Sequence, residues 1–197
     1  MTSTAMSLPV EKPPAVFAPV SDLKLLIVGD SGSGKTSLLS ALTYGTSTKQ
    51  DIPNDQYVVV QVEIKDTLVR LVFWDTPPQA DNMQMFSYPD TSVVLISFAV
   101  DDPDSLINVA DKWIGEVTHY NYGLPVLLVA NKTDLWYDPS IIEQLGKADR
   151  HPVTTQEGMA VAKKLAGIDV YMKSSAKSGE GVQELLRVVG RVACSAR

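Results

Sequence analysis

The sequence is poor in cysteine and has no excess of positive charge. Cys194 is the only cysteine among 197 residues, so an intramolecular disulfide is impossible and a reducing compartment is expected. The 17 Lys and Arg residues are outnumbered by 23 Asp and Glu residues, which gives a formal net charge of −6. A chain with this balance lacks the basic surface that binding to nucleic acid or anionic lipid requires. We therefore expect a cytoplasmic protein that does not bind nucleic acid.

Long apolar runs are also missing, which limits the ways in which the chain can meet a membrane. No stretch approaches the roughly 18 consecutive apolar residues that a transmembrane helix needs. The first 19 residues contain prolines and no basic cluster ahead of an apolar segment, so they do not have the pattern of a signal peptide. We predict a disordered, proline-containing leader over residues 1–22. Residues 23–197 are long enough for a single α/β domain with its own core.

The sequence does contain a regular alternation of β-rich and helical segments. Two β-rich segments, at residues 57–65 and 68–74, are joined by a short polar turn that favours a hairpin. The others are separated by helical patterns, which favours a mostly parallel sheet covered by helices on both faces. The expected strands lie at residues 23–28, 57–65, 68–74, 92–100, 126–130 and 170–174, and the expected helices at residues 36–42, 103–120, 139–147, 155–165 and 182–192.

The strongest local signal lies between the first expected strand and the first expected helix. Residues 29–36 have the sequence Gly-Asp-Ser-Gly-Ser-Gly-Lys-Thr, which satisfies the phosphate-loop pattern G-x-x-x-x-G-K-[S/T]. Glycines let the backbone turn its N–H groups toward phosphate oxygens, and the following helix directs its positive end at the same anion. We expect Lys35 to bridge the terminal phosphates and the Thr36 hydroxyl to hold Mg²⁺. The alternative, a glycine-rich turn with a solvated lysine, is disfavoured by the strand–loop–helix context.

A second motif predicts which base the nucleotide carries. Asn131-Lys132-Thr133-Asp134 directly follows the strand expected at residues 126–130, so it should lie at the carboxyl edge of the sheet. A carboxylate there can accept hydrogen bonds from N1–H and the exocyclic amine of guanine, whereas adenine offers neither donor. We expect Asp134 to select guanine, Asn131 to face N7 and O6, and the Lys132 stem to cover the ring. Taken alone, the motif is equally consistent with a polar strand-to-helix turn.

A third segment is expected at the same edge of the sheet. Ser174-Ser175-Ala176-Lys177 follows the last expected strand, and the N–H of Ala176 could meet O6 of guanine. Three such segments at strand ends make a guanine-nucleotide site the better interpretation. The residues expected to contact GTP or GDP are Asp30, Ser31, Gly32, Ser33, Gly34, Lys35, Thr36, Ser37, Asn131, Lys132, Asp134, Ser175, Ala176 and Lys177.

Together these segments resemble the Ras-like small GTPases and, within them, the Rho family. The sequence W-D-T at residues 74–76, followed by Gln79, is similar to the W-D-T-A-G-Q segment of those proteins. S-Y-P-D-T at residues 87–91, D-P-D-S-L at residues 102–106 and Lys112-Trp113 are similar to Rho proteins in particular. The resemblance extends over residues 23–194 and so covers nearly all of the expected domain.

The resemblance implies a fold, a cofactor and a set of partners. The fold would be a three-layer α/β P-loop NTPase G domain, with a six-stranded, mostly parallel sheet, flanking helices and a Rho-type insert at about residues 135–153. Thr36 and Asp75 would bind Mg²⁺, and Gln79 and Lys35 would be the catalytic residues for GTP hydrolysis. The implied protein is a monomeric signalling switch that regulates the cytoskeleton, cell polarity or the cell wall. Its partners would be exchange factors, GTPase-activating proteins and effectors, some of them at the cytoplasmic face of the plasma membrane.

The sequence departs from the family pattern in the two loops that should sense the γ-phosphate. Pro53 or a neighbour occupies the position of a threonine that binds Mg²⁺ in relatives, and Thr46 or Thr48 could replace it only in a shifted register. Pro78 stands where relatives have a glycine whose N–H contacts the γ-phosphate, and proline has no N–H to donate. We therefore expect nucleotide binding with slow or impaired hydrolysis.

Other functions stay open on the sequence alone. The altered loops also fit a pseudo-GTPase scaffold with a fixed effector-binding surface. A P-loop kinase that uses ATP is disfavoured, because adenine lacks the hydrogen-bond donors that Asp134 needs. Cys194 stands fourth from the end, as a prenylation site does, but Arg197 is a poor terminal residue for that signal. An incidental cysteine is the preferred interpretation, and membrane attachment is left undecided.

Overall fold

The computed structural model describes residues 22–44, 57–65, 67–75, 88–120, 123–165 and 167–196. The expected leader, apart from Asp22, lies outside this part of the chain. So do the first loop around Pro53 and the second loop with Pro78 and Gln79. What the sequence predicts for these segments therefore stays a prediction.

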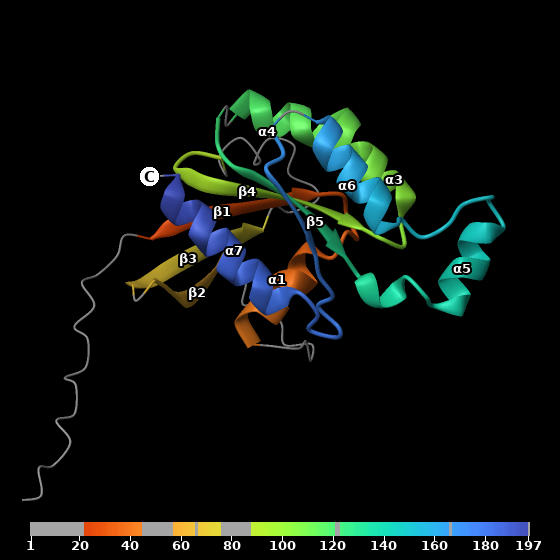
Figure 1. The fold of residues 1–197 in the computed structure, drawn as a ribbon, viewed down its shortest axis with the longest axis horizontal. Coiled ribbons are helices and arrows are strands. Elements are labelled where there is room, and N and C mark those ends of the chain that lie inside the picture. The colour runs from red at the N-terminus through yellow and green to blue at the C-terminus, as the bar shows by residue number, and fades with distance from the viewer. Residues whose placement is uncertain are drawn as a thin grey trace, which may run out of the picture.

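A single six-stranded sheet runs through the described part of the chain (Figure 1). Its order is β2-β3-β1-β4-β5-β6, with β2 antiparallel to β3 and every other pair of neighbours parallel. The expected mostly parallel sheet is confirmed, including its hairpin. The strands are β1 (Leu23–Gly29), β2 (Tyr57–Ile64), β3 (Thr67–Asp75), β4 (Thr91–Ala99), β5 (Val126–Asn131) and β6 (Val170–Lys173).

Helices cover both faces of this sheet and give the molecule three layers (Figure 1). In β1, Leu25 and Ile27 pack in one core cluster and Leu26 and Val28 in the other, because successive side chains of a strand point to opposite faces. Helices α1 (Lys35–Tyr44) and α7 (Val182–Ser195) contribute to the first cluster. The second cluster is closed by α3 (Pro103–Asn108), the π turn η1 (Val109–Trp113), α4 (Ile114–Tyr120) and α6 (Thr155–Lys164).

The helix expected at residues 103–120 is present, but it is not α-helical throughout. Asp102 caps its start by accepting a hydrogen bond from the N–H of Asp104, and Pro103 fits the first turn, where its missing N–H costs nothing. In η1 the backbone changes to π-helical hydrogen bonding, with the N–H of Ile114 donating to the carbonyl of Val109. The segment 103–120 is thus an α-helix interrupted by one π turn.

The expected insert contains a short helix, α5 (Pro139–Gly146), that stands apart from the layers (Figure 1). Asp138 caps it by accepting hydrogen bonds from the N–H groups of Ser140 and Ile141, and none of its residues is buried. The 3-10 turn η2 (Thr133–Leu135) leads into the insert. At its far end, the N–H of Val153 donates to the carbonyl of Val100 over 2.8 Å, which returns the chain to the sheet.

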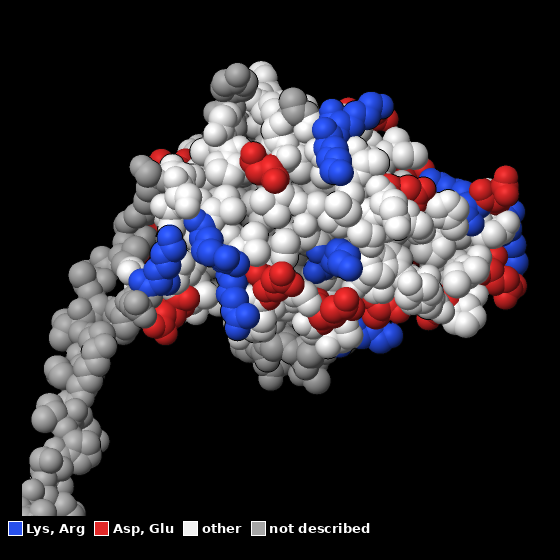
Figure 2. Space-filling view, in the orientation of Figure 1, with Lys and Arg blue, Asp and Glu red and all other residues white. Residues whose placement is uncertain are grey.

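On the face drawn in Figure 2, acidic and basic side chains are interspersed. Among the described residues, no helix combines the length and apolar character that crossing a bilayer demands.

Truncating a side chain should cost most stability where that side chain lies in the sheet between the two layers of helices. Ile96 of β4 has no exposed surface, so Ile96→Ala should lower the free energy of unfolding by about 2–5 kcal/mol. Ile107 of α3 is 52% exposed, and Ile107→Ala should change it by no more than about 0.5 kcal/mol. Urea denaturation followed by circular dichroism measures both, and equal losses in the two variants would contradict the burial described for Ile96.

Candidate functional site

The phosphate loop joins β1 to α1 and passes very close to β4. Gly29 has φ 142°, and a Cβ at this position would lie 2.1 Å from the carbonyl oxygen of Ser97. Both the backbone angle and the lack of space therefore require glycine there. At the other end of the loop, Gly34 has φ 89°, and a Cβ there would contact the Asn131 side chain at 3.4 Å. The loop is thus packed against β4 and β5.

Lys35 is buried at the start of α1 and holds the loop from inside. Its Nζ donates hydrogen bonds to the carbonyl oxygens of Gly29 at 2.8 Å and Asp30 at 2.7 Å. Burial lowers the pKa of Lys35, and the charges of Asp75 and Asp30 oppose that shift. The ammonium therefore lies in an environment where an additional negative charge would stabilise its protonated form.

The two residues expected to bind magnesium lie side by side. The Thr36 hydroxyl donates to Oδ2 of Asp75 over 2.6 Å. Oδ1 of Asp75 is buried and has no hydrogen-bond partner among the described residues, which is unusual for a carboxylate oxygen. A hydroxyl beside a carboxylate with a free oxygen fits the oxygen ligands and bound waters of Mg²⁺. In the described residues no cluster of three or more His, Cys, Asp or Glu side chains could hold a metal, so the magnesium prediction depends on this pair.

Asn131, at the end of β5, links the phosphate loop to two strands. Its Nδ2 donates to the carbonyl of Ser33 at 2.9 Å and to Oγ of Ser97 at 2.7 Å. Its Oδ1 accepts a hydrogen bond from the Ser174 hydroxyl at 2.5 Å. Both amide hydrogens are therefore directed at protein atoms, and Asn131 acts as a brace in this structure. Its expected contact with guanine N7 stays a prediction and would require one of these bonds to be shared.

Lys132 adopts a conformation that is uncommon for a residue with a side chain. Its φ of 60° and ψ of 36° lie in the left-handed region, which costs about 1 kcal/mol or more outside glycine. Its Nζ forms an ion pair with Oδ2 of Asp101 at 3.0 Å. The charged end is thus held by Asp101, just beyond the end of β4, and Lys132 also lines the cavity described next.

Asp134 and the phosphate loop line the same cavity. The Ser175 hydroxyl donates to Oδ1 of Asp134 at 2.5 Å, and Lys177 Nζ lies 3.7 Å from its Oδ2. Three segments that the sequence separates widely thus meet at one edge of the sheet, as expected. The cavity has a volume of about 240 Å³ and is lined by Gly34, Ser37, Asn131, Lys132, Asp134, Leu135, Ala176 and Lys177.

Several residues of this region were not predicted from the sequence. Ser97 binds Asn131, and Asp101 pairs with Lys132. The segment of Ser174 was expected at this edge, but its bond to Asn131 was not. The side chain of Asp30 is bound by Asn108 and Trp113, and the expected contact of Asp30 with the nucleotide stays a prediction. The one available signal was a hydroxyl at position 97 inside the otherwise apolar run of residues 93–99. Gln79, the expected catalytic glutamine, lies outside the described residues.

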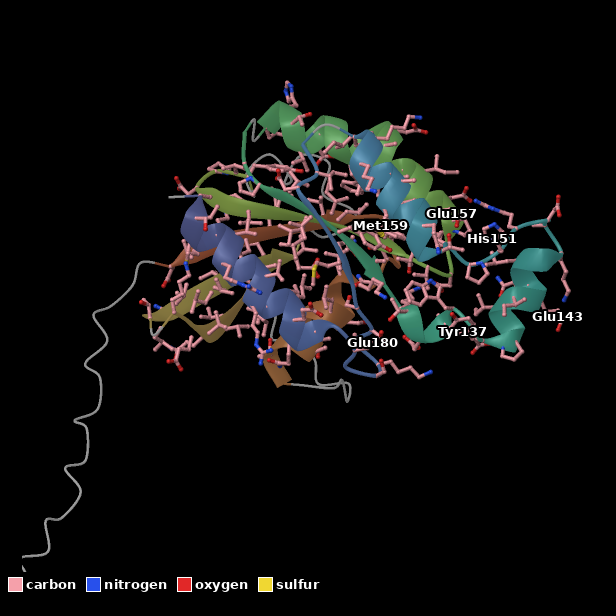
Figure 3. All side chains as sticks on the ribbon, in the orientation of Figure 1. Tyr137, Glu143, His151, Glu157, Met159 and Glu180 are labelled. Carbon is pink, nitrogen blue, oxygen red and sulfur yellow. The ribbon has the colours of Figure 1, made fainter. Side chains whose placement is uncertain are left out.

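His151 and Glu157 lie outside this site and contact each other. His151 lies 3.7 Å from Glu157, and both are labelled in Figure 3 at the point where the insert rejoins α6. Glu157 also completes the capping box of α6 with Thr154. These contacts explain the two side chains as parts of a helix start.

Comparison with known proteins identifies the family. The model of the Ras family matches residues 24–194, nearly the whole described domain. The chain is a member of the Ras family. Rho proteins are its relatives within that family: GTP-binding protein rho1 of Schizosaccharomyces pombe is 49% identical over 174 residues, covering 86% of this chain and 85% of the relative. GTP-binding protein RHO1 of Saccharomyces cerevisiae is 45% identical, covering 85% of this chain and 81% of the relative.

The similarity to Rho proteins extends beyond fungi. Rho-related GTP-binding protein RhoB of Homo sapiens is 39% identical over 178 residues, covering 88% of this chain and 90% of the relative. The resemblance to the Rho family seen in the motifs is therefore confirmed, and the chain is a Rho-like small GTPase. Its described sheet and helices agree with the G-domain fold of the family.

The contribution of the Asn131 hydrogen bonds to stability should be measurable without any ligand in this Rho-like GTPase. Ser97→Ala removes an acceptor and leaves a buried N–H of Asn131 unpaired, so the free energy of unfolding should fall by about 1–3 kcal/mol. Ser40 is a matched control, because its hydroxyl is buried and has no partner among the described residues. Ser40→Ala should be neutral or stabilising. Urea denaturation of nucleotide-free protein compares the two, and equal effects would show that Ser97 does not support the brace.

Proposed function

We propose that this Rho-like small GTPase binds GTP and GDP with Mg²⁺ and acts as a signalling switch whose own hydrolysis of GTP is slow. One observation carries the proposal: Gly34 of the phosphate loop and the carboxylate-bearing Asp134 line a single cavity. A phosphate-binding loop beside a carboxylate that can select a purine fits one guanine nucleotide. The relatives named above as GTP-binding proteins support the same function.

Selection of the base is assigned to Asp134. A carboxylate has about four lone-pair positions, so the bond from Ser175 and the neighbouring Lys177 leave acceptors free. These acceptors fit the N1–H and the exocyclic amine of guanine, and Ala176 on the cavity wall supports the predicted N–H contact to O6. An adenine in the same place would leave the carboxylate unpaired, which is costly in a partly buried site.

Asp134→Asn tests this assignment, because it keeps the shape of the side chain and replaces one acceptor by a donor. Its affinity for GDP should fall by about 100-fold or more, since the amide would face the N–H groups of guanine. Xanthosine diphosphate carries a carbonyl where guanine has its amine, so the variant should prefer it to GDP. Competition against fluorescent GDP measures both affinities.

The control for this experiment is Asp149→Asn, at an exposed position in the insert. It makes the same chemical change outside the cavity and should leave the preference for GDP unaltered. An Asp134→Asn protein that still preferred GDP over xanthosine diphosphate would refute the role of Asp134.

Binding of the phosphates is assigned to Lys35, Thr36 and Asp75. Two of the three N–H donors of Lys35 are used by loop carbonyls, which leaves one for a phosphate oxygen. The Thr36 hydroxyl has lone pairs left for a metal ion, and the free Oδ1 of Asp75 can accept from a metal-bound water. When bound there, Mg²⁺ would neutralise charge that develops on the terminal phosphates during hydrolysis.

Slow hydrolysis is inferred from the second loop of the sequence. Gln79 has the position of the glutamine that orients the attacking water, and Lys35 would stabilise the transferred charge. Pro78 beside it cannot donate a backbone hydrogen bond to the γ-phosphate. One preorganised donor of this kind is worth about 100-fold to 1,000-fold in rate in other enzymes. A protein that lacks it should turn over slowly unless a partner supplies a replacement.

Pro78→Gly should restore the missing donor and raise the single-turnover rate of GTP hydrolysis by about tenfold or more. Pro77→Gly is the matched control. It makes the backbone more flexible at the neighbouring position, where relatives carry alanine, but adds no N–H at position 78. Radioactive phosphate release from preloaded protein measures both rates. Equal acceleration by the two variants would assign the effect to loop flexibility and contradict the argument from the N–H group.

A second function is supported by the same prolines. If both loops have lost their γ-phosphate sensors, the protein is a nucleotide-binding scaffold with a fixed effector surface. GDP and a non-hydrolysable GTP analogue would then bind equally well. Two ligands that bind with equal affinity cannot shift the equilibrium between two conformations in different directions. A clear preference for one of the two nucleotides favours the switch. As a switch, the protein would be a monomer that binds exchange factors, GTPase-activating proteins and effectors in the cytoplasm or at the plasma membrane.

A further inference from the structure

The side chain of Asp30, the second residue of the phosphate loop, is held by the helix that packs beside the loop. Its Oδ2 accepts a hydrogen bond from Nδ2 of Asn108 at 2.6 Å, and its Oδ1 accepts one from the indole Nε1 of Trp113 at 2.7 Å. Trp113 is only 4% exposed. Hydrogen bonds to a carboxylate in such a poorly hydrated place are stronger than those between neutral groups. The loop is therefore clamped from outside the cavity.

The π turn explains how two residues of one helix can reach the same carboxylate. Asn108 and Trp113 are five positions apart, and in an α-helix such residues point about 140° away from each other around the axis. A π turn bonds residue i to residue i+5 and so brings positions five apart close to the same side. The π turn η1 spans Val109–Trp113, which is the segment between these two donors. The irregularity in the helix and the clamp on Asp30 thus belong together.

Asp30 also makes contact on the ligand side of the loop, through its backbone. Its carbonyl oxygen accepts a hydrogen bond from Nζ of Lys35 at 2.7 Å. One residue therefore joins the helix to the buried ammonium that is assigned to the phosphates. Neither Asn108 nor Trp113 lines the cavity that contains Asp134, and the side chains of both reach the loop through the carboxylate of Asp30.

We propose that Asn108 and Trp113 are positioning residues: through Asp30 they hold the phosphate loop and Lys35 in the conformation that binds the β-phosphate of a guanine nucleotide. The proposal rests on the proposed function, because it assigns regulation of nucleotide retention to the same site. It predicts a contribution to the binding of the diphosphate group and none to the recognition of the base.

Lys112, in the same π turn, covers the ring of the tryptophan that binds Asp30. Its Nζ lies 4.3 Å from the centre of the Trp113 ring, in a cation–π contact.

Trp113→Phe removes the indole donor and keeps an aromatic ring in the core. We expect GDP to dissociate about tenfold faster from this variant, the effect of losing one hydrogen bond to a charged group. Affinity for GMP, which has no β-phosphate, should change by less than about twofold. Stopped-flow release of fluorescent GDP and competition by GMP measure the two quantities. Asn108→Ala should act in the same direction and serves as the second variant if the tryptophan change impairs folding.

Trp136→Phe is the matched control. Its indole Nε1 also donates a hydrogen bond of 2.7 Å, but to the carbonyl of Val153 at the end of the insert. It should lower thermal stability as Trp113→Phe does, without changing the ratio of GDP to GMP affinity. The clamp is overturned if that ratio is unchanged in Trp113→Phe and Asn108→Ala, or if it changes equally in Trp136→Phe. Native protein that retains no GDP would instead refute the proposed function itself, and with it the clamp.

Discussion

The amide of Asn131 is the contact on which the arrangement of the site depends. It is 3% exposed and joins three segments: the phosphate loop at Ser33, strand β4 at Ser97, and the end of β6 at Ser174. A buried amide is costly to leave unpaired, so each of these partners is strongly favoured in its present place. The cavity beside Asp134 keeps its shape because its two sides are fixed to one side chain.

A second set of contacts fixes the loop from the helical layer. Asn131 binds the middle of the loop from the sheet, while Trp113 and Asn108 bind its second residue from the helix. Between them, Lys35 holds the carbonyls of Gly29 and Asp30. A loop held on both sides needs little rearrangement to receive phosphates, which is the usual meaning of preorganisation in a binding site.

Most of the fold could be predicted from the sequence because its signals are local. Each strand is a short apolar run, and β1, β4 and β5 are buried on both faces, so the runs have few interruptions. The convergence of the phosphate loop, Asp134 and Ala176 followed from one rule, that the carboxyl ends of parallel strands share an edge. The pairing of Asp30 with Trp113 had no such local signal, because it joins residues 83 positions apart. The π turn was also missed, since its residues have ordinary helical propensities.

Helix α5 of the insert illustrates how a segment can belong to the domain without contributing a buried residue to its core. Helix α5 has no buried residue, and the chain on either side of it is tied back through Trp136, Arg150 and Val153. Tyr137 at its start is 87% exposed (Figure 3). Because its outward side chains pack against nothing in the described chain, substitutions there carry little penalty for folding. The exposed face of α5 can therefore be altered without disturbing the pocket at the sheet edge, which none of the residues of α5 lines.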